Sequence, residues 1–189
     1  MPSPPDHRAR VATIGVYGFE LESFLAALRD AGVRVLLDVR QRRGVRGREY
    51  AWANSRRLQA ALAGAGIEYR HLPALAPTTE LRRLQYREDD RRGVGRRSRT
   101  ELVREYVERY TREILDPADL APVAASLPAH GAAALLCVER DPEACHRSLI
   151  AARLASGHGA EVEHLRPPPT LASPAAARRR PRSPRGPRA

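Results

Sequence analysis

The chain has 189 residues, a formal net charge of +11 and a hydrophobic content of 42%. This length allows one domain with a full core, and no apolar run approaches the roughly 20 residues that cross a bilayer, so we expect no membrane partner. The N-terminus carries no apolar signal segment, and two cysteines are too few for a disulfide framework. We therefore expect a cytoplasmic protein with both thiols reduced.

All 33 basic residues are arginine. A GC-rich coding bias, which favours Arg, Ala, Gly and Pro, explains this composition without any function. A functional explanation is that the planar guanidinium matches the geometry of a phosphate. The positions of the arginines are therefore more informative than their number.

The first half of the chain predicts alternating strands and helices after a polar, proline-rich start. Residues 1–9 are expected to be disordered. Apolar runs and helical spacing then predict, in order, a strand at 11–16, a helix at 20–31, a strand at 33–39, a helix at 55–65 and a strand at 67–72.

The second half begins with a highly charged segment, about 80–100, which we interpret as an exposed insertion or a mobile flap. The pattern then predicts helices at 100–115 and 120–127, a strand at 132–138, a helix from about 142 to 155 and a short strand at 161–165. The tail, 167–189, contains seven prolines and six arginines and no acidic residue. It cannot bury a core and is expected to be disordered.

This alternation predicts an α/β fold, a single domain over 10–166 with a mainly parallel sheet and helices on both faces. The carboxyl ends of parallel strands meet at one edge of the sheet, where such folds bind ligands. Tyr17 follows the first strand, Asp38 and Arg40 end the second, and Glu139 follows the fourth. We therefore expect these side chains to converge.

The strand at 132–138 leads directly into a polar segment and a helix. Asp141 can cap the helix and Pro142 suits its first position. Cys145, His146 and Arg147 then fall in its first turns, close to Glu139. A thiol, an imidazole, a carboxylate and a guanidinium together can carry out chemistry.

We assign candidate roles by residue type. The catalytic candidates are Glu139, Cys145, His146 and Asp38, and the ligand-binding candidates are Tyr17, Arg40 and Arg147. The structural alternatives are an ion pair between Asp38 and Arg40, a surface position for His146 and a capping role for Glu139. Cys137 lies within an apolar strand and is expected to be a core residue.

A Gly/Arg loop with two aromatic residues follows the second strand. Arginines bind backbone phosphates and aromatic rings stack on bases, so this loop is a candidate nucleic-acid surface, formed by Arg42, Arg43, Arg46, Arg48, Tyr50 and Trp52. The alternative is a solvated loop with two packed aromatics. We expect no metal and no cofactor, because two cysteines eight positions apart and one histidine fall short of a zinc signature.

Several short motifs resemble the family called domain of unknown function 488. The matching segments are Thr13-Ile14-Gly15, Phe24-Leu25, Asp38-Val39-Arg40, Gly66-Ile67-Glu68-Tyr69-Arg70-His71-Leu72, Cys137-Val138-Glu139 and Cys145-His146-Arg147. The resemblance spans roughly 11–165. It implies a compact α/β domain and no settled activity.

Three functions remain open from the sequence. The first is an enzyme or binding protein for a phosphate-bearing ligand, either a nucleic acid or a nucleotide, with hydrolytic or transfer chemistry. The second is a non-catalytic accessory protein that binds nucleic acid. The third is a thiol-dependent enzyme acting on a small metabolite. The oligomeric state is not encoded in any pattern we find.

Overall fold

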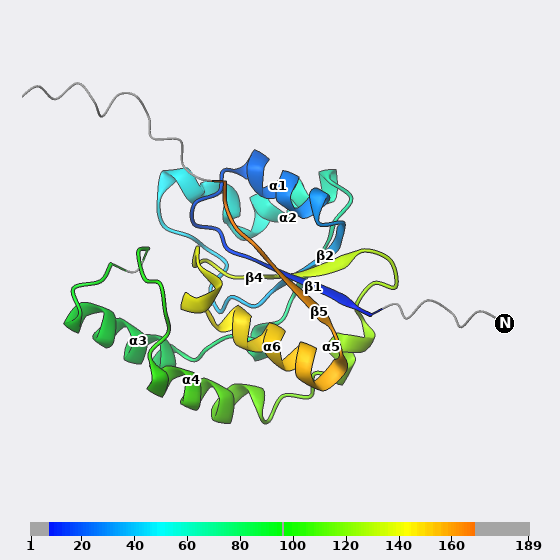
Figure 1. The fold of residues 1–189 in the computed structure, drawn as a ribbon. Coiled ribbons are helices and arrows are strands. Elements are labelled where there is room, and N and C mark those ends of the chain that lie inside the picture. The colour runs from blue at the N-terminus through cyan, green and yellow to red at the C-terminus, as the bar shows by residue number, and fades with distance from the viewer. Residues whose placement is uncertain (1–7, 96, 169–189) are drawn as a thin grey trace, which may run out of the picture.

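The structure, a computed structural model, describes residues 8–95 and 97–168 as a sheet flanked by helices (Figure 1). The strands are β1 (Arg10–Ile14), β2 (Val33–Asp38), β3 (Glu68–His71), β4 (Ala132–Leu136) and β5 (Glu161–Leu165). The helices are α1 (Leu21–Asp30), α2 (Ser55–Gly64), α3 (Thr79–Arg91), α4 (Arg104–Tyr110), α5 (Ala121–Ala125) and α6 (His146–His158). The expected disordered ends, 1–9 and 167–189, lie outside the described residues except for 8, 9, 167 and 168.

Shorter helical turns complete the chain. Turns of 3₁₀ helix cover Arg48–Ala53, Pro73–Leu75 and Pro142–Ala144, and a π-helical turn over Thr111–Leu115 continues α4. None of the helices in the described ranges combines the length and the apolar composition that crossing a bilayer requires.

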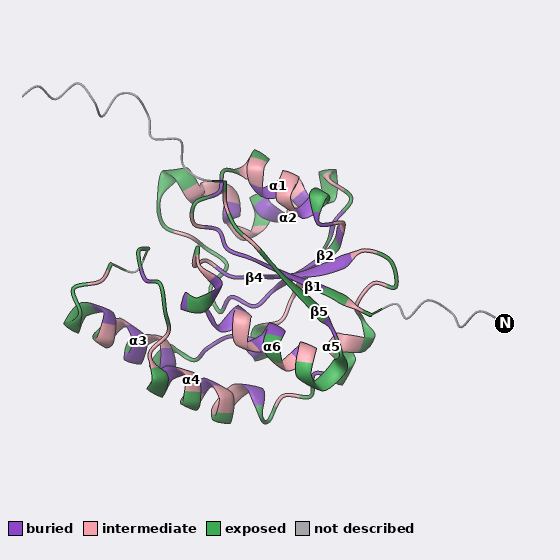
Figure 2. Cartoon of the chain, in the orientation of Figure 1, coloured by how far each residue is buried: buried purple, intermediate pink, exposed green. Residues whose placement is uncertain are grey.

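All strand pairs in the sheet are parallel, and the strand order is β3-β2-β4-β1-β5. This confirms the predicted α/β class. The central strand β4 is buried along its whole length, whereas the edge strand β5 is mostly exposed (Figure 2). Small alanines in β4 let helices approach both faces of the sheet closely.

Helices cover both faces of the sheet. The helices α1 and α2 lie on one face, and α3 to α6 lie on the other (Figure 1). Alternate residues of β2 pack into the two hydrophobic cores on opposite faces of the sheet. Val35 and Leu37 belong to the α3–α6 core, and Leu36 belongs to the α1–α2 core. The chain thus buries two cores around one sheet.

A crevice forms where the connections from neighbouring strands diverge. From β2 the chain runs through α2 to β3, whereas from the adjacent β4 it runs through α6, on the opposite face, to β5. In open α/β sheets, ligands bind outside the carboxyl ends of the strands at such a switch point. The loops that follow β1, β2 and β4 border this crevice.

The segment 80–100 differs from the exposed insertion expected from its charge. Most of its first half forms α3, which buries Leu81, Leu84, Gln85 and Asp89 against the rest of the domain, and Arg99 is buried as well. Apolar and amide residues recur at helical spacing within the charged run, and this pattern outweighs the overall charge. The first half of the segment therefore packs against the core, whereas the described residues between 90 and 98 are mostly exposed.

The loops after β1 and β4 contact each other through their backbones. The amides of Val16 and Tyr17 donate to the Val138 carbonyl at 3.2 and 2.9 Å. Gly15 lies so close to this loop that a Cβ atom there would clash with the Glu139 carbonyl oxygen. Glycine at this position therefore allows the loop carrying Glu139 to approach β1.

We predict that Gly15→Ala destabilises the fold by at least about 2 kcal/mol, because the methyl group meets backbone that must move. Gly64→Ala is the matched control, since no atom apart from its chain neighbours and the backbone of its own helix lies within 4 Å of its Cβ position. That control is expected to be neutral or slightly stabilising, because alanine favours helix. Urea unfolding of both variants tests this, and equal stability would contradict the packing described.

Candidate functional site

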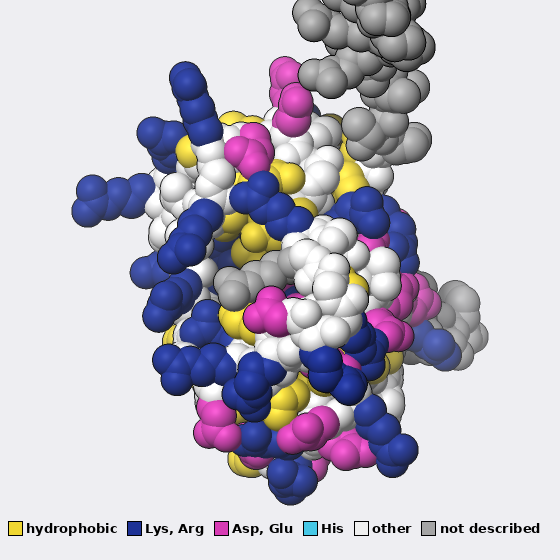
Figure 3. Space-filling model, turned by 90° about the vertical axis from the view of Figure 1, so that its left-hand side faces the viewer, with side chains coloured by type: hydrophobic (Ala, Val, Ile, Leu, Met, Phe, Trp, Pro, Cys, Tyr) yellow, Lys and Arg dark blue, Asp and Glu magenta, His cyan; other side chains and the backbone are white. Residues whose placement is uncertain are grey.

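A cavity of about 400 Å³ opens at the carboxyl ends of the central strands. It is lined by the loops after β1, β2 and β4, by α3 and by the segment 97–106. On the surface, arginine side chains gather around a hollow with a hydrophobic floor (Figure 3). The lining arginines are Arg40, Arg42, Arg46, Arg82, Arg97 and Arg99.

Arg40 lies at the end of β2 and is held by Asp38. The two side chains are 2% and 0% exposed, and the guanidinium donates to both carboxylate oxygens at 2.8 and 2.7 Å. A third N–H donates to the Ala53 carbonyl at 3.0 Å. Tyr69 donates its hydroxyl to Asp38 at 2.7 Å. These bonds use three of the five guanidinium N–H groups, so Arg40 is oriented yet retains donors.

The ion pair of Asp38 and Arg40, given above as the structural alternative, is present, and Arg40 also lines the cavity. Burial acts to lower the Arg40 pKa, but the hydrogen bond and charge of Asp38 outweigh burial and raise it. Asp38 itself is occupied by Arg40 and Tyr69 and lies behind the cavity wall. Its position suits the orientation of Arg40.

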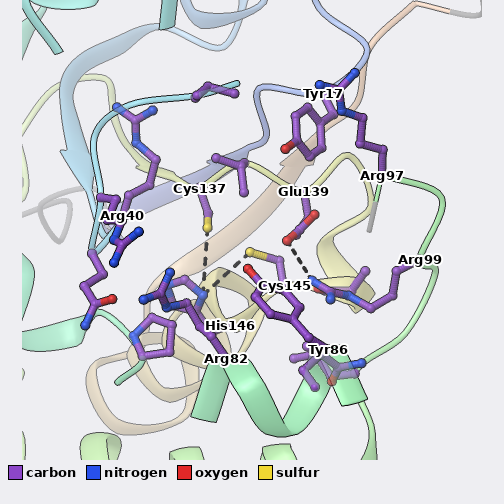
Figure 4. Close-up of a pocket in the computed structure, with 18 of the residues that line it drawn as sticks. Tyr17, Arg40, Arg82, Tyr86, Arg97, Arg99, Cys137, Glu139, Cys145 and His146 are labelled. Carbon is purple, nitrogen blue, oxygen red and sulfur yellow. Dashed lines mark hydrogen bonds and ion pairs between the residues drawn. The ribbon is translucent and has the colours of Figure 1, made fainter. Parts of the chain in front are cut away.

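Glu139 follows β4 and points toward Arg99 across the cavity (Figure 4). The Arg99 guanidinium bridges two carboxylates, with N–O distances of 2.7 Å to Glu139 and 2.7 Å to Asp89. Asp89 also accepts a hydrogen bond from Gln85 at 2.8 Å. Burial raises the pKa of the Glu139 carboxyl to about 7, against the lowering effect of Arg99. This carboxyl therefore changes protonation near neutral pH.

Cys137, Cys145 and His146 meet at the floor of the cavity (Figure 4). Each sulfur lies 3.8 Å from the Nδ1 atom of His146. Cys145 occupies the N-cap position of α6. Cys137 was expected to be a plain core residue; it is buried, but it also faces the cavity.

The two thiols have opposite pKa shifts. Burial acts to raise the pKa of Cys145, but the hydrogen bond from Cys137 and the charges of Arg147 and His146 outweigh it and lower the pKa well below its ordinary value. The bond to Cys145 and burial raise the Cys137 pKa. The pair therefore favours a thiolate on Cys145 and a protonated Cys137.

Arg147 is fully buried and lies outside the lining of the cavity. Its guanidinium donates to the Glu139 carbonyl at 2.7 Å and to the Arg140 carbonyl at 3.0 Å. It thereby fixes the loop that carries Glu139. This contact pattern favours a positioning role over the ligand contact predicted for Arg147.

Only some side chains of the basic loop after β2 face the cavity. Arg42 and Arg46 line the cavity, whereas Arg43 and Arg48 do not. Trp52 packs on Phe24, with ring centroids 4.9 Å apart, which matches the packed alternative for this residue.

Tyr17 and Tyr50 form a small aromatic cluster at the rim. Their ring centroids are 5.1 Å apart, and the Arg97 guanidinium lies 5.4 and 5.3 Å from the two rings. Arg97 also pairs with Glu49 at 2.8 Å. These contacts join the segment after α3 to the loop after β2 and close the cavity on one side.

Several lining residues were not among the site residues predicted from the sequence. They are Gln85, Arg82, Tyr86, Arg97, Arg99 and Tyr106. Arg82, Gln85, Tyr86 and Asp89 follow one another at helical spacing, which would have placed them on one face of α3. Their location opposite the strand ends depends on how α3 packs, and no local pattern encodes that packing.

We predict that Arg99→Gln destabilises the protein by about 3 kcal/mol, because it leaves the buried carboxylate of Asp89 and the partly buried carboxylate of Glu139 without their partner. Arg153→Gln is the control: its pair with Asp116 has the same 2.7 Å distance, but the two side chains are 36% and 54% exposed. That control is expected to cost less than about 1 kcal/mol. Urea midpoints test the difference, and equal midpoints would show that Arg99 does not join the two sides of the cavity.

Comparison with known proteins gives one match. The model of the family described as Domain of unknown function DUF488 matches residues 20–154 of the 189 residues. No curated protein and no solved structure matches the chain.

Proposed function

The chain belongs to the DUF488 family, and we propose that it binds a phosphate-bearing small molecule, a nucleotide, in the cavity at the strand ends. The observation that carries this proposal is the arginine lining of a cavity at the switch point of the sheet. The family description names no activity, so we infer the function from the side chains that line the cavity.

The charge of the lining favours an anion. Six arginines line the cavity, and the only acidic residue among the lining residues described is Glu139, which is already paired with Arg99. Guanidinium groups in a partly desolvated site bind phosphate oxygens through charge-assisted hydrogen bonds. Three of the six, Arg40, Arg97 and Arg99, are already paired with carboxylates. A dianionic phosphate would balance much of the charge of the other three.

Arg82 offers a specific donor for such a ligand. Its Nε atom is buried and has no hydrogen-bond partner among the described residues, although Arg82 lines the cavity. One terminal nitrogen donates to the Thr79 hydroxyl at 3.1 Å, which orients the side chain. An unpaired buried donor is costly, and a phosphate oxygen would satisfy it after a small movement of the Arg82 side chain that exposes the atom to the cavity.

The size of the cavity favours a nucleotide over a double helix. A volume of about 400 Å³ falls within the range of small-molecule sites, which is roughly 300 to 1,000 Å³. Tyr17 and Tyr86 add aromatic surface to the lining, where a base can stack. Glu139, Cys145 and His146 face the same space, so hydrolysis or group transfer on the bound ligand is the chemistry that we propose.

We predict that AMP binds the full chain and that adenosine does not, as measured by isothermal titration calorimetry. Arg82→Gln is expected to weaken AMP binding at least about tenfold, since a charge-assisted hydrogen bond contributes about 1.5 to 3 kcal/mol. Arg83→Gln is the matched control, because Arg83 is the next residue of α3, is exposed and lies outside the lining. It should leave AMP binding unchanged.

Two outcomes would overturn this proposal. Equal binding of AMP and adenosine would show that the arginines do not recognise phosphate. Binding of short single-stranded RNA or DNA that is stronger than AMP binding and indifferent to Arg82→Gln would favour the non-catalytic nucleic-acid accessory protein instead, with the exposed loop arginines as its contact surface.

A further inference from the structure

We propose that Cys137, Cys145 and His146 bind one thiophilic divalent cation, with Zn²⁺ as the metal that this donor set suits best. The two sulfurs and the imidazole nitrogen all lie within 4.8 Å of one another, and all three residues are buried. They come from the end of β4 and the start of α6, two elements fixed by the sheet (Figure 4). The site goes beyond the proposed function, because it does not depend on a phosphate-bearing ligand.

The distances fit tetrahedral coordination. Zinc binds sulfur at about 2.3 Å and imidazole nitrogen at about 2.0 to 2.1 Å, so two such ligands at the tetrahedral angle lie about 3.6 Å apart. Both sulfurs lie 3.8 Å from Nδ1 of His146. A cation between the three atoms therefore requires the two S–N separations to change by only a few tenths of an ångström. Two zinc-bound sulfurs lie about 3.8 Å apart, so the S–S separation, which is at most 4.8 Å, would shorten by about 1 Å or less.

The surroundings of His146 direct Nδ1 toward the sulfurs. Its Nε2 atom lies 3.1 Å from the Val39 carbonyl oxygen, which can only accept a hydrogen bond. The proton therefore resides on Nε2, and in the neutral ring Nδ1 presents a lone pair to both sulfurs. A backbone carbonyl bonded to the second ring nitrogen is the usual support of a metal-binding histidine. The ring of Tyr110 packs against the imidazole at 5.4 Å.

Three protein ligands are the number found in catalytic zinc sites, which keep the fourth position open. All three residues line the cavity, so the fourth position faces the space assigned to the nucleotide. Two thiolates balance the charge of a divalent cation, so the centre adds no net positive charge beside the arginines. In this arrangement Cys145 is a metal ligand and not an attacking thiol.

The test is a titration of the reduced, chelator-treated full chain with Co²⁺. We expect one Co²⁺ per chain, a near-ultraviolet thiolate-to-cobalt band, the visible bands of tetrahedral cobalt, and displacement by Zn²⁺. Cys137→Ser and His146→Ala should each weaken binding by at least about a hundredfold, since loss of even an outer-shell partner costs 10- to 100-fold. His158→Ala, an exposed histidine at the other end of α6, should leave binding unchanged.

The thiolate-to-cobalt band is measured on the wild-type chain. It therefore tests coordination by cysteine even where a variant fails to fold. Cobalt binding without this band would overturn the proposal, as would equal binding by the wild type and a folded Cys137→Ser variant. A reduced chain that binds no Co²⁺ would overturn it too. Arg82→Gln should retain full cobalt binding, so failure of the nucleotide proposal and failure of the metal proposal are distinguishable.

Discussion

The buried guanidinium of Arg99 lies between two carboxylates, the buried Asp89 from α3 and the partly buried Glu139 from the loop after β4. This bridge joins the helical layer to the end of the sheet at the point where the connections from β2 and β4 diverge. A buried charge must be paired, so the position of each partner determines that of the others. The orientation of Glu139 and the closure of the cavity both depend on this contact.

The same edge of the sheet brings two kinds of chemistry together. Arginines form the walls and rim of the cavity, whereas the two thiols and the imidazole of His146 form its floor. The arginines of the walls can bind the phosphate of a ligand. The thiols and the imidazole of the floor can bind a cation, which would then contact the same ligand. Buried residues behind the lining hold both in place: Asp38 orients Arg40, and Arg147 fixes the backbone at Glu139.

Much of the fold was predictable from local patterns. Continuous apolar runs identified the buried strands, and their alternation with helices gave a parallel sheet, so Arg40 and Glu139 were expected at one edge. Two cysteines and one histidine fell short of a zinc signature, so the sequence argued against a metal. The sequence does not show that the two sulfurs and the imidazole of His146 come together around the 3₁₀ turn over Pro142–Ala144.

The segment after β3 was the least predictable part. Its charge indicated exposure, yet Gln85, Asp89 and Arg99 are buried because they satisfy one another and the Val103 amide. Such pairing is a property of tertiary structure and leaves no periodic signal. This segment adds three arginines to the cavity, Arg82, Arg97 and Arg99. Their position at the cavity depends on the tertiary structure, so it could not be predicted from the sequence.

The central claim is that the arginine-lined cavity binds a phosphate group. A crystal structure of the full chain soaked in tungstate, a phosphate mimic that scatters anomalously, tests this most directly. We expect an anomalous peak inside the cavity, within hydrogen-bond distance of Arg82 and at least one other lining arginine. Tungstate bound only at exposed arginines outside the cavity, with an empty cavity, would contradict the claim.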